Sequence, residues 1–309
     1  MKQNTNKQKI IIIAGPTASG KSDLSIKIAK KYSGEILSAD SRQVYRGMDI
    51  GTGKATKMER KIVKHYLIDV VSPKKQFTAS DFKRLGEKAI KEILAQNKIP
   101  IIVGGTGFYI DVLLGRIAIA EVPPNKKLRM KLEKQSVKQL FKKLSALNPQ
   151  YSANIDRHNK RRLIRTIEIS YKLKIPQPTT YNLKPMAYSV LWLGLNPKDL
   201  KERIKKRLDR RLRQGMIKEI EQLHKKGLSW KRMDELGLEY RWASRWLKKS
   251  KFNTPYSKFL DSNEYQGLLK GIIKYSKRQM TWFKRNKEIQ WFTNSKEALG
   301  TLSKLTQLG

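Results

Sequence analysis

Eight consecutive residues near the N-terminus have the types and spacing of a phosphate-binding loop. They match G-x-x-x-x-G-K-[ST] in full and read Gly15, Pro16, Thr17, Ala18, Ser19, Gly20, Lys21 and Ser22. The two glycines let successive backbone N–H groups converge on phosphate oxygens, and the dipole of a following helix adds to that attraction. Lys21 would neutralise a terminal phosphate, and the Ser22 hydroxyl would ligate Mg²⁺. The loop alone predicts a phosphate site, with ATP or GTP as the default ligand.

Two other polar segments come directly after apolar runs. Asp40 follows Glu35–Ala39, and Thr106 follows Ile99–Gly104. The carboxyl ends of parallel strands border the ligand crevice of an open sheet, so both side chains are expected near the loop. Asp40 could serve as a base, an Mg²⁺ anchor or a helix cap, and Thr106 could line the crevice or cap a helix.

The spacing of apolar residues predicts an α/β fold, a P-loop NTPase-like parallel sheet flanked by helices. Near-continuous β-branched runs predict strands at Ile10–Ala14, Glu35–Ala39, His65–Val71, Ile99–Gly104, Tyr188–Leu195 and Ile289–Phe292. Helical patterns cover Ser22–Tyr32, Ala79–Gln96, Pro197–Lys226 and Glu264–Asn286.

Residues 117–185 interrupt this alternation. They contain no convincing strand and carry basic helical stretches at Asn125–Gln135, Val137–Leu147 and Arg161–Lys174. We interpret the segment as an all-helical insertion domain that contacts RNA. Residues 1–116 and 186–309 would then form the catalytic core with the C-terminal helices.

The charge balance points to a polyanionic partner. Lys and Arg total 67 against 26 Asp and Glu, a formal net charge of +41. Such a field attracts nucleic acid or anionic membrane, although a lysine bias of the genome would spread lysines over every solvated face as well. The chain has no Cys, which excludes disulfides and thiolate metal sites. The apolar run Ile10–Ala14 is too short to span a membrane.

Several segments together resemble the tRNA dimethylallyltransferase family, in its order and spacing. They are GPTASGKS at the loop, SADSRQVYRGMDIGTGK from Ser38, HYLIDVVSP from His65, FTASDF from Phe77, IPIIVGGTGFY from Ile99, RRLIRTIEI from Arg161, GLEYR from Gly237 and KRQMTWFK from Lys277. The resemblance implies transfer of a dimethylallyl group from its diphosphate to the N6 amine of an adenosine in tRNA. That adenosine lies 3′ to the anticodon in tRNAs reading codons that begin with U. The loop would therefore hold the diphosphate of the donor, with Mg²⁺ as cofactor.

The resemblance also implies roles for individual residues. Asp40 would be the base that takes the amine proton, and Thr106 would contact that carboxylate or the flipped adenine. Lys21 and Arg278 would stabilise the departing diphosphate, although Arg278 could instead contact the tRNA backbone. The stretches that match tRNA contacts comprise Asp40, Ser41, Arg42, Gln43, Thr106, Arg129, Arg161, Arg162, Leu163, Ile164 and Arg165. Arg203 and Arg207 lie four apart on a predicted helix, and they would either bind phosphate or form an exposed basic face.

Two other functions use the same motifs. An adenylate isopentenyltransferase would take a free nucleotide as acceptor, but the +41 charge favours a polyanionic one. An RNA-binding P-loop kinase or ATPase would need a second carboxylate near the phosphates, for which the sequence offers Asp40 and Asp69. We expect a cytoplasmic monomer without membrane contact that acts on the tRNA anticodon stem-loop.

Overall fold

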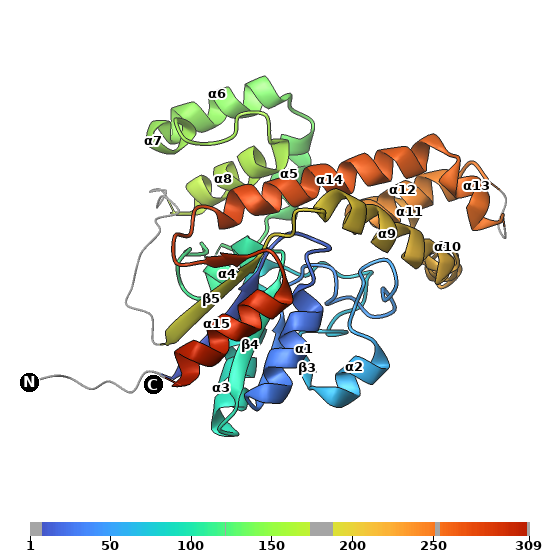
Figure 1. Ribbon diagram of the computed structural model, residues 1–309. Coiled ribbons are helices and arrows are strands. Elements are labelled where there is room, and N and C mark those ends of the chain that lie inside the picture. The colour runs from blue at the N-terminus through green and yellow to red at the C-terminus, as the bar shows by residue number, and fades with distance from the viewer. Residues whose placement is uncertain (1–7, 121, 174–187, 251–253, 308–309) are drawn as a thin grey trace, which may run out of the picture. The chain divides into compact units, whose positions relative to one another are not determined.

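The chain forms two units, one from Met1–Leu114 with Pro185–Gly309 and one from Gly115–Lys184. The computed structural model describes residues 8–120, 122–173, 188–250 and 254–307 (Figure 1). The first unit contains the sheet, and the described part of the second is built from helices without strands. No helix in the described ranges is long and apolar enough to cross a membrane.

Six parallel strands make one sheet in the order β3-β2-β4-β1-β5-β6. They are β1 (Lys9–Ala14), β2 (Gly34–Ser38), β3 (His65–Tyr66), β4 (Ile99–Gly104), β5 (Ser189–Leu195) and β6 (Gln290–Phe292). Because β1 lies between β4 and β5, the loop that follows it emerges near the middle of the carboxyl edge of the sheet. The predicted α/β fold is confirmed.

Successive residues of β1 enter two different cores. Ile11 and Ile13 pack with α1 (Lys21–Lys31) and α15 (Ser295–Gln307), whereas Ile10 and Ile12 pack with α3 (Ala79–Ala95) and α4 (Gly107–Leu113). Side chains alternate between the faces of a strand, so an all-apolar strand must be covered on both sides. Figure 1 shows α1 and α15 lying over the same side of the strands.

Two predicted elements differ from the structure. The expected strand His65–Val71 joins the sheet only over its first two residues, because Leu67 and Asp69 take φ of 60° and turn the chain away; Val71 then makes an isolated bridge to Tyr45. The expected helix Pro197–Lys226 is two helices, α9 (Leu200–Arg213) and α10 (Met216–Lys225). The break falls at Gly215, whose φ of 96° is open to glycine but strained for other residues.

The C-terminal helices make a core of their own. Besides α9 and α10 they are α11 (Trp230–Glu235), α12 (Leu238–Leu247), α13 (Tyr256–Leu260) and α14 (Asn263–Phe283). Val44, Tyr45 and Met48 from the segment after β2 are buried in the same cluster. Between that segment and β3 lies the short, exposed helix α2 (Lys57–Ile62). The segment that starts at Asp40 is therefore anchored to the C-terminal helices by the burial of these three side chains.

In its described residues, the second unit packs four helices around a small apolar core. They are α5 (Lys126–Glu133), α6 (Val137–Leu147), α7 (Pro149–Ser152) and α8 (Lys160–Leu173). Leu132, Leu140, Leu144, Leu163 and Ile167 form the centre of that core.

A buried carboxylate, Glu168, fixes the start of α5 against α8. Its side chain is 1% exposed and receives hydrogen bonds from Arg129 Nη2 at 2.6 Å, Arg165 Nη1 at 2.5 Å and the backbone N–H of Asn125 at 2.5 Å. Burial alone would raise the pKa of Glu168, but the hydrogen bonds from both arginines hold it below its usual value. The ion pairs therefore stabilise the unit, and that contribution is lost as the pH falls and Glu168 protonates.

Glu168→Ala should destabilise the helical unit strongly, because it leaves two half-buried guanidinium groups without their carboxylate. We expect a loss of about 3–5 kcal/mol, measured by urea unfolding and by faster hydrogen exchange in α5 and α8. Glu133→Ala is the control, since its exposed carboxylate only approaches Lys160 at 3.8 Å. Equal effects of the two substitutions would contradict this account of Glu168.

Candidate functional site

The eight predicted phosphate-binding residues form the turn between β1 and α1, and α1 begins at Lys21. Gly15 and Gly20 have φ of 144° and 95°, conformations that L side chains rarely adopt. A Cβ on Gly15 would also lie 2.5 Å from the Leu195 carbonyl oxygen. The geometry required for a phosphate cradle is therefore built into the backbone.

Lys21 folds back over this loop. Its ammonium donates to the Pro16 carbonyl oxygen at 2.6 Å and to Ser19 Oγ at 3.4 Å. Burial and the nearby Arg207 guanidinium lower the pKa of Lys21 to about 7, against a smaller opposing effect of Asp40. The protein environment therefore disfavours the charged form of Lys21, and a bound anion would stabilise that charge.

Gln279 on α14 joins the loop to the next strand end. Its Oε1 accepts from the Thr17 backbone N–H at 2.9 Å, and its Nε2 donates to the Gly105 carbonyl oxygen at 2.9 Å. The side chain is 6% exposed, and a Cβ on Gly105 would lie 2.0 Å from Nε2. Only glycine at position 105 leaves room for this contact.

Asp40 and Thr106 lie at the same edge of the sheet, as predicted. Asp40 Oδ1 accepts from the Arg42 backbone N–H at 2.8 Å, and Thr106 Oγ1 accepts from the Ser41 backbone N–H at 3.4 Å. Neither side chain caps a helix: no helix follows Asp40, and Thr106 makes no capping hydrogen bond to α4. Burial together with Asp40 raises the pKa of Tyr275 to about 12, so this phenol stays protonated.

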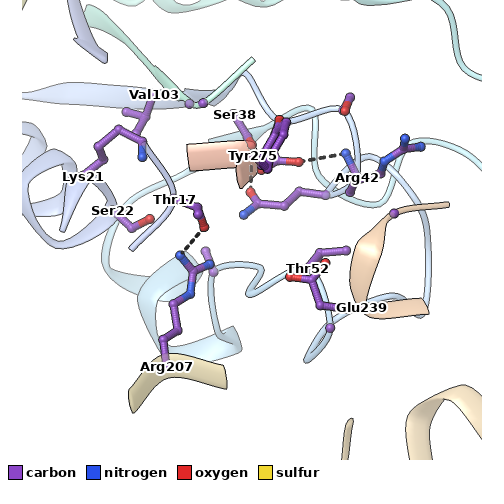
Figure 2. Close-up of a pocket in the computed structure, with 18 of the residues that line it drawn as sticks. Thr17, Lys21, Ser22, Ser38, Arg42, Thr52, Val103, Arg207, Glu239 and Tyr275 are labelled. Carbon is purple, nitrogen blue, oxygen red and sulfur yellow. Dashed lines mark hydrogen bonds between the residues drawn. The ribbon is translucent and has the colours of Figure 1, made fainter. Parts of the chain in front are cut away.

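Asp40, Tyr275 and Gln279 line one pocket of about 390 Å³ with Thr17, Lys21 and Ser22 of the loop, and the neighbouring Thr106 is not part of its wall. Figure 2 shows Arg207 directed at Thr17, with Lys21 and Ser22 beside it and Tyr275 and Arg42 across the pocket. The cationic groups in its wall are Lys21, Arg42, Arg207, Arg211, Arg241 and Arg278, and the carboxylates are Asp40, Glu59 and Glu239. The excess of positive charge suits an anionic ligand.

The predicted pair Arg203 and Arg207 separates in the structure. Arg207 Nη1 donates to Thr17 Oγ1 at 3.2 Å, and burial together with Arg211 lowers its pKa to about 9, which still leaves it charged at neutral pH. Arg203 is exposed and pairs with Asp199 at 2.7 Å. The phosphate-binding interpretation therefore fits Arg207, and the exposed basic face fits Arg203.

Two charged side chains, buried Lys54 and partly buried Glu219, hold the chain between Asp40 and Lys54 in place. Lys54 is 1% exposed in its side chain and donates to Tyr45 O at 2.9 Å, Asp49 Oδ1 at 2.6 Å and Asp69 Oδ1 at 2.6 Å. Glu219 accepts from three successive backbone N–H groups, those of residues 49, 50 and 51, and from the Tyr240 hydroxyl. Asp69 also pairs with Arg60 at 2.9 Å, and it does not line the pocket.

The predicted tRNA contacts of the insertion fall into two groups. Arg161 and Arg162 are exposed on α8. The side chains of Leu163 and Ile164 are buried in the core of the unit, so they present no surface to RNA. Arg129 and Arg165 bind Glu168 and are about one-third exposed, so both have a structural role in addition to any RNA contact.

Three residues that complete the pocket were not assigned by sequence reasoning. Tyr275 and Gln279 lie four apart on α14 and face the pocket together, and Arg211 lies one turn after Arg207 on α9. The i, i+4 spacing was a usable signal for both pairs. Arg278, which was predicted, is exposed at the pocket wall, and its guanidinium lies 5.7 Å from the Tyr275 ring.

His65 and the other metal-binding residue types give no metal cluster. His65 Nδ1 bonds the Val63 carbonyl oxygen at 2.7 Å. Among the residues that the structure describes, no group of three or more His, Cys, Asp or Glu side chains is placed to hold a metal ion. Ser22, exposed at the start of α1 and in the pocket wall, is compatible with a hydroxyl ligand to Mg²⁺.

Comparisons with known proteins agree with one another. The model of the IPP transferase family matches residues 43–286. A tRNA dimethylallyltransferase of Geotalea daltonii is 40% identical over 304 residues, which cover 95% of both chains. A tRNA isopentenylpyrophosphate transferase of Staphylococcus epidermidis has a crystal structure with a TM-score of 0.68 and 33% identity, covering 97% of this chain and 99% of that one.

A eukaryotic dimethylallyltransferase acting on tRNA is structurally similar too. Its TM-score is 0.72 at 26% identity, and the match covers 89% of this chain and 70% of the eukaryotic one. The family match covers more than half of the chain, and the bacterial relatives match along nearly its whole length. The chain belongs to the IPP transferase family.

Proposed function

We propose that the protein transfers a dimethylallyl group from dimethylallyl diphosphate to the N6 amine of the adenosine 3′ to the anticodon, in tRNAs that read codons beginning with U. The main support is that Gln279 joins the P-loop directly to the strand end that carries Thr106, beside Asp40. One pocket thereby combines a cationic cradle for a leaving diphosphate with a carboxylate that can accept a proton. The names of the relatives point to the same reaction.

The residues divide the reaction between them. The P-loop N–H groups, Lys21 and Arg207 hold the diphosphate and stabilise the charge that develops as the allylic C–O bond breaks. The electron pair of that bond leaves with the diphosphate, and the adenine N6 forms the new bond to carbon. Asp40 takes the proton that N6 loses, and Thr106 with Tyr275 orients the base. Mg²⁺ held by Ser22 would further neutralise the diphosphate.

Two sets of residues would contact the tRNA acceptor. Ser41, Arg42 and Gln43 would contact the nucleotides around the flipped adenosine, and exposed Arg161 and Arg162 of the 117–185 insertion would bind phosphates. Arg278 would contact either the donor or the tRNA backbone. With tRNA as the substrate, we place the protein in the cytoplasm and expect it to act as a monomer.

The kinase or ATPase alternative loses one of its two candidate carboxylates, because Asp69 is paired with Lys54 and Arg60 away from the pocket. The adenylate alternative differs only in the acceptor. Labelled dimethylallyl diphosphate should be incubated with Mg²⁺ and either unmodified tRNA or AMP, with labelled ATP as a third donor arm. Label in tRNA alone is expected. Label in AMP but not tRNA, or ATP hydrolysis coupled to RNA, would overturn the proposal.

Asp40→Asn should slow turnover by about 10²–10⁴-fold while both substrates still bind, because the amide keeps the hydrogen bond to Arg42 but cannot take a proton. Single-turnover rates measure the effect, and filter binding measures tRNA affinity. Asp23→Asn is the matched control, an exposed carboxylate in the first turn of α1. Normal turnover in Asp40→Asn would remove Asp40 as the base.

Binding of diphosphate should take up protons at alkaline pH. Burial and Arg207 lower the pKa of Lys21 to about 7, so above that pH it is mostly neutral, and an anionic ligand would restore its charge. Calorimetric titration with inorganic diphosphate at about pH 8, in two buffers of different ionisation enthalpy, should show about one proton more taken up by the wild type than by Lys21→Met. Equal uptake by both proteins would contradict the assignment.

Arg162→Ala should change tRNA affinity, whereas Arg165→Ala should change the stability of the protein. Arg162 is exposed, so its loss should weaken tRNA binding about tenfold and reduce the salt dependence by about one counterion, with little change in stability. Arg165 holds Glu168, so its loss should lower the midpoint of urea unfolding. Tight tRNA binding by Arg162→Ala at every salt concentration would exclude Arg162 from the interface.

A further inference from the structure

Arg211 lies in the wall of the pocket with an incomplete set of partners. Its side chain is 8% exposed. Nη1 donates to the Gly51 carbonyl oxygen at 3.1 Å and to Glu239 Oε1 at 3.0 Å. Nη2 is buried and has no hydrogen-bond partner among the described residues. A buried guanidinium with an unused donor is costly, and the missing acceptor is an oxygen atom.

Arg207, one helical turn earlier on α9, lies next to it. The Nη2 atoms of Arg211 and Arg207 lie 1.9 Å and 2.6 Å from the position that a Cβ of Gly53 would take. Two guanidinium groups therefore share the same small space, and only glycine at position 53 leaves room for both. Arg207 reaches from there to the P-loop, where Nη1 donates to Thr17 Oγ1.

The protein supplies too little negative charge for this pair. Glu239 is the carboxylate that pairs with Arg211, and Arg207 forms no ion pair within the described ranges. Lys21, close enough to Arg207 for each charge to disfavour the other, adds a third cation. Like charges at such short range repel strongly in a partly buried site. An anionic ligand between the arginines and Thr17 would remove that repulsion.

We propose that Arg211 is a further ligand-binding residue of this pocket, which forms with Arg207 a paired-arginine subsite for one phosphate group beside Thr17. The inference rests on the proposed function, in which the phosphate belongs to the diphosphate of the donor. Two guanidinium forks present several N–H donors to one phosphate, the geometry in which arginine binds such groups best. A phosphate of the RNA backbone has the same chemistry, and the experiment must separate the two sources.

A binding residue and a structural ion pair respond differently to removal. In Arg211→Met with Glu239→Gln, both charges of the pair are removed, so no buried carboxylate is left alone. If Arg211 serves the ligand, the empty protein should unfold at the same temperature as the wild type or a higher one, because the repulsion with Arg207 is relieved. Its affinity for inorganic diphosphate with Mg²⁺ should fall at least about tenfold. Arg211→Lys keeps the positive charge but loses the planar guanidinium, so its diphosphate affinity should lie between those of the wild type and the double variant.

Arg210→Met is the matched control. Arg210 is the preceding residue of α9 and is exposed, so its removal takes one arginine from the same helix without touching the pocket. Calorimetry measures diphosphate affinity, thermal unfolding without ligand measures stability, and filter binding at two salt concentrations measures tRNA affinity. The control should keep the diphosphate affinity and the unfolding temperature of the wild type.

Three results would overturn the proposal. A double variant that binds diphosphate as the wild type does would exclude Arg211 from the subsite. A lower unfolding temperature with diphosphate affinity unchanged would show a structural ion pair. Loss of tRNA affinity with diphosphate affinity intact would assign the phosphate to RNA rather than to the donor. Failure of the wild type itself to bind diphosphate would instead refute the proposed function.

Discussion

The two hydrogen bonds of Gln279 set the distance between the P-loop and the strand end at Gly105, and the rest of the site depends on that distance. Its amide satisfies the Thr17 N–H with an acceptor and the Gly105 carbonyl with a donor, which a carboxylate of the same size could not do. Group transfer requires the reacting atoms to meet at about 3–3.5 Å, and the donor and acceptor sides of this pocket come from different strand ends. Because Gln279 touches both ends and is buried, a shift of α14 would move one substrate relative to the other.

The position of Asp40 also depends on two charged side chains, Lys54 and Glu219, that do not line the pocket. Asp40 starts a long segment without regular structure, and such a segment would be mobile if only its ends were fixed. Lys54 and Glu219 instead bind its far end through backbone and carboxylate groups, and Val44 with Met48 enters the helical core. Both charges make several hydrogen bonds, so they fix one conformation of the segment, and the burial of Lys54 does not leave its ammonium without partners. The position of Asp40 is thus a consequence of α10, over a hundred residues away.

Local patterns predicted the features that local physics determines. The P-loop glycines, the apolar strand Ile10–Ala14 and the placement of Thr106 at a strand end all follow from spacing and backbone preference. The predicted strand at His65 was too long because nothing in its composition reveals the positive φ of Leu67 and Asp69. Gln279 and Arg211 were missed for another reason. Their function lies in contacts across 262 and 160 residues, which no window along the chain contains.

Arginine shows the same limit most clearly, since one residue type does three jobs here. Arg165 neutralises a buried carboxylate, Arg203 pairs with a carboxylate in solvent, and Arg207 and Arg211 occupy a pocket where guanidinium groups outnumber carboxylates. Composition does not distinguish these arginines, and helical spacing predicts that Arg203 and Arg207 share one role, although the structure places them in different environments. What separates them is the set of partners that the fold supplies. Arg165 and Arg203 each have a carboxylate within hydrogen-bond distance, whereas Arg207 has none among the described residues and Arg211 Nη2 has no acceptor, and this unmet demand favours a negatively charged ligand in the pocket.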